Sequence, residues 1–105
     1  MDRIEKIRVM LAEQPGDPFL LHALALEYIK GGQEPLAREV FTSLLRENPG
    51  YVGSYYHLAK LLERTGETDE AVRVYQQGME QAARQGDRHA LNELRSAYDE
   101  LTSEP

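Results

Sequence analysis

Histidine is the side chain in this sequence best suited to metal binding or acid–base chemistry. The chain has three, His22, His57 and His89, and it has no cysteine. Neutral imidazole is a common metal ligand, so three converging histidines could hold a divalent cation. The lack of cysteine excludes disulfides, thiolate catalysis and cysteine-based zinc sites. A metal site would therefore require the fold to bring these three imidazoles together.

Other catalytic patterns are missing from the 105 residues. The sequence contains no nucleophile-elbow glycines, no phosphate-binding glycine loop and no His-Glu-x-x-His pair. Its acidic residues are scattered along the chain, and a solvated surface is the more common role for such carboxylates. We therefore expect a protein that is not an enzyme and that uses no cofactor.

Composition and charge limit the possible partners. Hydrophobic residues make up 41% and charged residues 29%, and the formal net charge is −6. A nucleic-acid interface needs a basic face, and an anionic membrane repels an excess of carboxylates, so we expect neither partner. The segment from Met1 to Lys6 is mostly charged, and no apolar run reaches the ~20 residues that span a bilayer. We expect a cytoplasmic protein.

Glycine and proline divide the chain into six segments. Within each segment the apolar residues are spaced by about 3.6 positions, which predicts an amphipathic helix. No segment alternates as a strand would. The predicted helices cover residues 2–14, 18–31, 34–47, 52–65, 68–85 and 88–102.

Polar residues at the predicted helix starts agree with the preferences for N-caps. Proline at the first helical position is a further start signal, and one follows Asp17 directly. The candidate capping residues are Asp17, Glu34, Thr68, Asp69 and Asp87.

The chain repeats itself with a period of 34 residues. A small residue at a repeated position lets neighbouring helices approach, an aromatic one fills the space between hairpins, and glycine supplies the turn. A period of this length indicates stacked helix hairpins. The shift pairs Leu24 with Leu58, Ala25 with Ala59, Gly32 with Gly66, Ala37 with Ala71, Val40 with Val74 and Phe41 with Tyr75.

This pattern resembles the tetratricopeptide repeat (TPR), whose signature is Trp-x2-Leu-Gly-x2-Tyr, then Ala-x3-Phe and Pro. In residues 18–51 the matching residues are Leu21, Leu24, Ala25, Tyr28, Gly32, Ala37, Phe41, Leu44 and Pro49. In residues 52–85 they are Tyr55, Leu58, Ala59, Leu62, Gly66, Ala71, Tyr75 and Gly78. The second stretch has Ala83 in place of proline, so its last helix is expected to continue to Gln85.

The resemblance, to small bacterial members of the family, implies an all-α fold. It implies a right-handed α-solenoid of antiparallel helix hairpins in a single domain over residues 1–105. Residues 2–14 would form the second helix of a half-repeat, with Ile7 in the place of Phe41. Residues 88–102 would form a capping helix, whose Arg95 at the close-packing position suits a terminal helix.

The resemblance also implies a binding groove. In this family the first helix of each repeat lines a concave face that receives extended peptides or helices. The three histidines fall on three of these helices, which lie ~10 Å apart, so no metal site is expected. The implied groove residues are Phe19, His22, Leu26, Ile29, Lys30, Tyr56, His57, Lys60, Arg64, His89 and Asn92.

Helix 18–31 is apolar nearly all round, which predicts burial on most sides. The repeat core accounts for much of this surface, but Phe19, Leu26 and Ile29 are left facing the groove. Either another part of the chain covers them, or they receive an apolar ligand segment or a second copy of the chain. Some family members clamp chaperone carboxylates with lysine and asparagine, and here His22 and Leu26 take those places, which disfavours that function.

Three functions follow as hypotheses. The leading one is a non-catalytic adaptor or scaffold that binds a peptide or helix of a partner protein in the groove, with micromolar-range affinity. The second is self-association, as a homodimer or within a larger assembly, through helix 2–14 or the apolar groove. Arg3 counts against helix 2–14, because it stands where the repeat has a small residue. The third is a metal-dependent function of the histidines.

Overall fold

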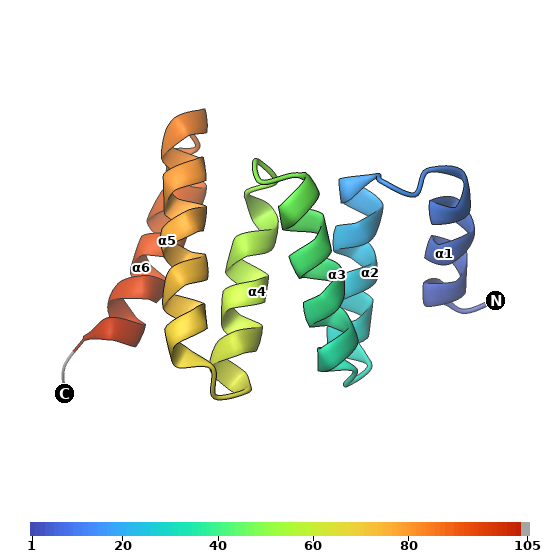
Figure 1. Ribbon diagram of the computed structural model, residues 1–105, viewed down its shortest axis with the longest axis horizontal. Coiled ribbons are helices and arrows are strands. Elements are labelled where there is room, and N and C mark those ends of the chain that lie inside the picture. The colour runs from blue at the N-terminus through green and yellow to red at the C-terminus, as the bar shows by residue number, and fades with distance from the viewer. Residues whose placement is uncertain (104–105) are drawn as a thin grey trace. The chain divides into compact units, whose positions relative to one another are not determined.

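The computed structural model describes residues 1–103, and these residues form six α-helices and no strand (Figure 1). Each helix end lies within one residue of its predicted position, and the all-α class is confirmed. Among the described residues no helix is long and apolar enough to cross a bilayer. The helices are α1 (Arg3–Glu13), α2 (Pro18–Lys30), α3 (Glu34–Glu47), α4 (Gly53–Arg64), α5 (Thr68–Gln85) and α6 (Arg88–Thr102).

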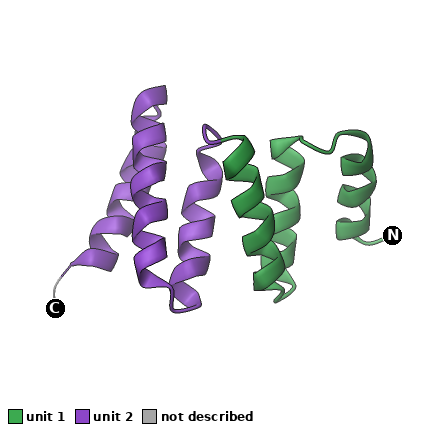
Figure 2. Ribbon diagram, viewed as in Figure 1, with its two compact units in different colours: residues 1–48 green, residues 49–105 purple. Residues whose placement is uncertain are grey.

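The helices belong to two compact units (Figure 2). Unit 1, residues 1–48, contains α1, α2 and α3, and α2 packs against both of its neighbours. Unit 2, from residue 49 onward, contains α4, α5 and α6, and α5 packs against the other two. In each unit a short turn joins antiparallel helices, so both are built from helix hairpins (Figure 1).

The turns of the two main hairpins are built alike, 34 residues apart. Gly32 and Gly66 have φ angles of +76° and +80°, in the left-handed region that favours glycine. The N–H of Gly32 donates to the carbonyl of Ile29 at 3.0 Å, and that of Gly66 donates to the carbonyl of Glu63 at 3.1 Å. In both turns the next residue closes a second bond of 2.8 Å. These bonds satisfy the last carbonyls of α2 and α4 and reverse the chain.

Side-chain caps begin three of the helices. Asp2, Asp17 and Asp87 each accept a hydrogen bond from the backbone N–H three residues later, at 2.8, 3.2 and 3.1 Å. Asp17 also precedes a proline in the first turn of α2. The predicted caps Asp17 and Asp87 are therefore confirmed.

The predicted caps of α3 and α5 were wrong. Glu34 and Thr68 are already the first helical residues, with Asp69 behind Thr68, and the preceding Gln33 and Glu67 make no side-chain cap bond. The physical reason is the glycine turn. Because its backbone bonds already fix the chain at the residue before the helix, no side chain is needed to start it.

Small and aromatic residues of the 34-residue pattern occupy the core of each unit. The alanines predicted to allow close approach have no exposed surface, and Phe41 and Tyr75, predicted to fill the space between hairpins, have none either. Burial therefore recurs with the period of the sequence. The fully buried alanines are Ala25, Ala37, Ala59 and Ala71.

The helices α4 and α5 approach each other at Gly78. A Cβ atom at this position would lie 2.7 Å from the Cβ of Tyr55, so no side chain fits there without movement. The hydroxyl of Tyr55 donates to the carbonyl of Pro49 at 2.6 Å, and the Nε2 of Gln85 donates to the carbonyl of Gly50 at 2.6 Å. These contacts tie the segment before α4 to the hairpin and fix where α4 begins.

Candidate functional site

Helix α2 has more apolar surface than the core of unit 1 covers. Its buried residues are Leu24, Ala25 and Tyr28. The Phe19 side chain is 68% exposed, whereas Leu26 and Ile29 are half-buried. The apolar character predicted for this helix therefore extends to its outer surface.

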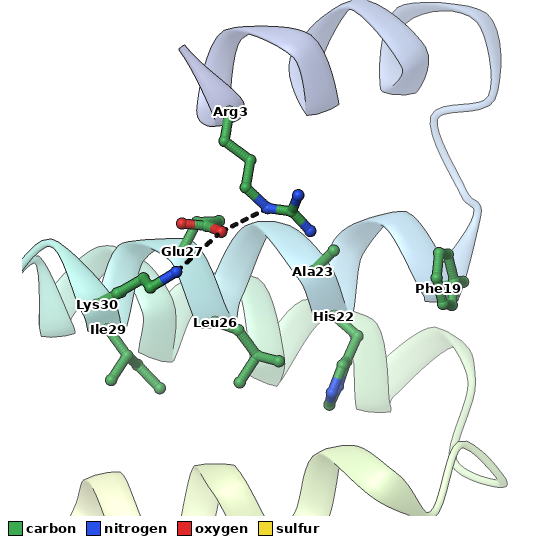
Figure 3. A pocket seen from close by; sticks show the side chains of 8 residues that line it. All are labelled: Arg3, Phe19, His22, Ala23, Leu26, Glu27, Ile29 and Lys30. Carbon is green, nitrogen blue, oxygen red and sulfur yellow. Dashed lines mark ion pairs between the residues drawn. The ribbon is translucent and has the colours of Figure 1, made fainter.

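This apolar surface lines a hollow of about 570 Å³ in unit 1, which we call the α2 hollow (Figure 3). Its volume falls in the range of ligand pockets, ~300 to 1,000 Å³. The structure brings together here all five groove residues that were predicted on this helix. The lining residues are Arg3, Phe19, His22, Ala23, Leu26, Glu27, Ile29 and Lys30.

One edge of the α2 hollow is charged. The Glu27 carboxylate, on a side chain only 16% exposed, lies 2.5 Å from Nε of Arg3 and 3.9 Å from Nζ of Lys30. Arg3 reaches across from α1 (Figure 3). Sequence reasoning missed Arg3 and Glu27 as site residues. The three-residue spacing of Glu27 and Lys30 was a usable signal, but the contact from Arg3 depends on how α1 packs on α2.

The position of His22 in the hollow is set by aromatic packing. Its ring meets Phe41 of α3 edge-to-face, with centroids 5.8 Å apart and an interplanar angle of 65°. In Figure 3 His22, Leu26 and Ile29 extend to the same side of α2, and Ala23 lies between His22 and Arg3. Ala23 is thus a small residue among larger ones, and it leaves space in the middle of the lining.

In unit 2 the corresponding positions carry side chains that contact one another. The 34-residue shift takes Ala23 to His57 and Leu26 to Lys60. The rings of Tyr56 and His57 meet edge-to-face at 5.8 Å, and Nζ of Lys60 lies 5.8 Å from the centre of the Tyr56 ring. The second contact has cation–π geometry. Three of the predicted residues on α4 therefore form one cluster.

A buried carboxylate–phenol contact anchors this cluster. Glu63 Oε2 lies 3.6 Å from Nζ of Lys60 and accepts a short hydrogen bond from the hydroxyl of Tyr75 on α5. Burial, together with the bonded Glu63 carboxylate, raises the pKa of Tyr75 above its ordinary value of 10. The phenol is therefore a neutral donor at pH 7. This contact joins two helices and was not predicted from the sequence.

His57 sits in a partly desolvated environment. Burial lowers its pKa, the carboxylate of Glu93 on α6 opposes that shift, and the charge of Arg64 adds to it. Arg64 itself lies exposed at the end of α4. The imidazole of His57 is therefore neutral at pH 7.

The predicted residues of α6 are exposed. His89 lies beside Glu93, with Nε2 and Oε2 3.9 Å apart, and Asn92 is exposed as well. In the part of the chain that the structure describes, no three His, Cys, Asp or Glu residues are grouped so that they could hold a metal ion. The metal-dependent hypothesis thus gains no support.

A second, smaller hollow of about 330 Å³ lies on α3, lined by Arg38, Glu39, Thr42 and Arg46. Arg38, Thr42 and Arg46 are spaced four residues apart and share a helix face. That spacing was visible in the sequence but was not used in the prediction.

The repeat pattern, the glycine turns and the hairpins can now be set against known proteins. The sequence profile of the family described as tetratricopeptide repeat matches residues 28–96, more than half of the chain. The chain belongs to the tetratricopeptide repeat family. The predicted resemblance is confirmed.

Solved structures agree with this assignment of the TPR protein. It is 41% identical to a tetratricopeptide repeat domain protein from Salinibacter ruber, whose solution structure covers 87% of this chain and 92% of its own, with a TM-score of 0.82. The crystal structure from the same organism covers 83% and 98%, with a TM-score of 0.80. A Bordetella parapertussis protein that is 24% identical shares the fold, covering 96% and 88% with a TM-score of 0.81. No curated protein matches.

Membership of the family carries a general statement about function. TPR domains generally mediate protein–protein interaction, and the family is typically non-catalytic. The fold alone does not name a partner or a surface, so those must be argued from the residues of this TPR protein.

Proposed function

We propose that this TPR protein is an adaptor that binds a peptide or helix of a partner protein through the α2 hollow. The observation that supports the proposal is the exposed apolar surface of α2, where Phe19 is 68% exposed beside the half-buried Leu26 and Ile29. Burying apolar surface contributes roughly 25 cal/mol per Å², so this part of the molecule has the most to gain from a partner.

The predicted groove residues of unit 2 are proposed as polar contacts. Tyr56, His57 and Lys60 already contact one another, so they offer a fixed arrangement of polar groups. Such groups orient a ligand more than they strengthen its binding. Arg64, His89 and Asn92 are exposed and stay predicted contacts, as the cytoplasmic location also stays a prediction. We expect micromolar-range affinity.

The proposal is tested by capturing partners from a lysate of the cells that make the protein. Three baits are compared by mass spectrometry: the native chain, Leu26→Asp and Leu36→Asp. Leu26 lines the α2 hollow, whereas Leu36 is an exposed leucine of α3 outside it. Circular dichroism first establishes that both variants keep the helical fold.

We expect proteins that the native chain and Leu36→Asp both capture and that Leu26→Asp loses, because a carboxylate in the apolar lining opposes desolvation. If Leu26→Asp captures the same proteins as the native chain, the α2 hollow is not the binding surface. In that case the polar cluster of unit 2 or an outer helix face becomes the better candidate.

Self-association is the second candidate, and the exposed face of α1 favours it. Val9 and Met10 are 54% and 46% exposed, and Ile7 is the buried residue of this helix. Against it, the 34-residue shift places Arg3 and Lys6 where α3 has the small Ala37 and the apolar Val40. A helix packed on α1 as α2 packs on α3 would therefore meet two cations.

Sedimentation equilibrium of the native chain, Met10→Glu and Leu26→Asp separates the possibilities. A dimer that Met10→Glu abolishes would place the contact on α1. A dimer that only Leu26→Asp abolishes would place a second copy in the α2 hollow. A monomeric mass at the highest soluble concentration would remove self-association from consideration.

A further inference from the structure

We infer that the α2 hollow selects segments in which a large apolar side chain is accompanied by a carboxylate. The apolar side chain would rest on Ala23, and the carboxylate would bind the guanidinium of Arg3. This inference rests on the proposed function and adds the chemistry of the partner.

The apolar part of the argument depends on Ala23. This residue lies in the middle of the lining, and its neighbours Phe19, Leu26 and Ile29 offer apolar surface around it. In unit 2 the corresponding position is His57, whose ring packs against a tyrosine. The small side chain of Ala23 therefore keeps open in unit 1 a space that a ring takes up in unit 2.

The carboxylate part of the argument depends on Arg3. Its Nε is paired with Glu27 at 2.5 Å, which fixes the side chain, yet that side chain remains 69% exposed. A guanidinium carries five N–H donors in a planar fork, and one carboxylate oxygen at Nε leaves most of them available. In Figure 3 the terminal nitrogens extend beyond Glu27 toward Ala23. A ligand carboxylate placed there would meet a preorganised donor pair.

The local charge supports an acidic partner over a basic one. Two cations, Arg3 and Lys30, flank the single carboxylate of Glu27, so this edge is positive on a chain whose net charge is −6. A basic segment in the hollow would meet like charges at that edge. An acidic one is repelled by most of the surface and attracted here, which favours a single orientation of binding.

The test is selection of a random twelve-residue peptide library, displayed on phage, against the immobilised native chain at ~0.15 M salt, where weak surface attraction is screened. We expect the enriched peptides to share a Leu, Ile, Phe, Met or Trp with an Asp or Glu within four positions. Selection against Ala23→Trp, which fills the hollow without changing charge, should lose this motif. Ala83→Trp, at an exposed alanine of α5, is the matched control and should keep it.

Arginine variants test the carboxylate contact separately. Arg3→Gln should retain the apolar preference and lose the acidic one, whereas Arg3→Lys and the control Arg46→Gln on α3 should keep both. A selected peptide, made with blocked termini, is then compared with its Glu→Gln or Asp→Asn form. The native chain should bind the acidic form roughly tenfold more tightly, and Arg3→Gln should bind both forms alike.

The possible failures are distinguishable. Enriched peptides without an acidic preference, or a motif that survives Ala23→Trp, would overturn this inference and leave the proposed function standing if Leu26→Asp still loses its partners. If the native chain enriches no peptide, the inference is overturned. If Leu26→Asp also captures the native set from the lysate, the proposed function fails with it.

Discussion

The carboxylate of Glu63 has two partners in unit 2, Nζ of Lys60 at 3.6 Å and the buried hydroxyl of Tyr75. The 34-residue shift takes Glu63 and Tyr75 to Ile29 and Phe41 in unit 1, where no such bond is needed. One pair of positions is thus polar in one unit and apolar in the other. Exchanges at this scale leave the fold intact and change what the helices offer at the surface.

We predict that Tyr75→Phe lowers the free energy of unfolding by about 1.5 kcal/mol. That is the low end for a hydrogen bond to a charged group, because Glu63 is partly exposed and water can replace the phenol. The double variant Tyr75→Phe/Glu63→Ile, which reproduces the pair of unit 1, should recover most of the loss. Urea unfolding followed by circular dichroism measures both. Equal stability of the single and double variants would contradict this account.

His57 gives a prediction for pH dependence. Because burial lowers its pKa in the folded chain, the unfolded chain binds more protons as the pH falls through the ordinary value of about 6.5. The contribution of neutral His57 to stability is therefore present above pH ~6.5 and is lost as the pH falls toward the folded value. His57→Gln should flatten the stability profile between about pH 7.5 and 5.5.

The control for this pH prediction is His89→Gln, because the His89 side chain is exposed on α6. Its stability should change with pH as that of the native chain does. A titration of the His57 imidazole by NMR should give a pKa below 6.5. A value above 6.5, or identical profiles for His57→Gln and the native chain, would be inconsistent with the burial described here.

Among the elements, α2 and α3 begin in different ways. α2 follows an open loop and uses the Asp17 side chain, whereas α3 follows a glycine turn and uses backbone bonds alone. Sequence reasoning found the first start and gave a wrong reason for the second. A capping rule considers only residues near the helix end, and it does not register that a turn has already ordered them.

This difference leads to a prediction about the helix that carries the hollow. Asp17→Ala should lower stability by about 1 kcal/mol, the typical value of an N-cap, because the N–H of Leu20 loses its acceptor. Gln33→Ala should change stability by less than about 0.5 kcal/mol, because Gln33 makes no side-chain cap bond. Thermal unfolding compares the two, and a larger loss for Gln33→Ala would refute the assignment of the caps.

The approach of α4 to α5 is tested at Gly78. Gly78→Ala should destabilise the chain by about 1 to 3 kcal/mol, because the added Cβ would overlap Tyr55 at 2.7 Å. Gly53, at the start of α4, has open space around its Cβ position, so Gly53→Ala should be neutral or slightly stabilising. Chemical unfolding of both variants measures this contrast, and equal effects would show that α4 and α5 adjust easily.

For the molecule as a whole, the sequence predicted what repeats and missed what crosses between helices. The period of 34 residues located the six helices, the buried alanines and the five predicted residues of the α2 hollow, because each follows from local spacing. The Arg3–Glu27 and Tyr75–Glu63 contacts join different helices. Their formation depends on packing geometry, and no spacing rule within one helix reports it.

The whole chain combines a negative net charge with one apolar, positively edged hollow in a TPR fold. The central claim is that partners bind on the exposed apolar face of α2. Methyl-resolved NMR of the full chain, recorded with and without a captured partner, tests it most directly. The claim predicts that the methyl signals of Ala23, Leu26 and Ile29 shift or broaden while that of Leu36 does not. Unchanged signals from these three residues, with shifts confined to Val9 and Met10 or to α3 and α5, would contradict it.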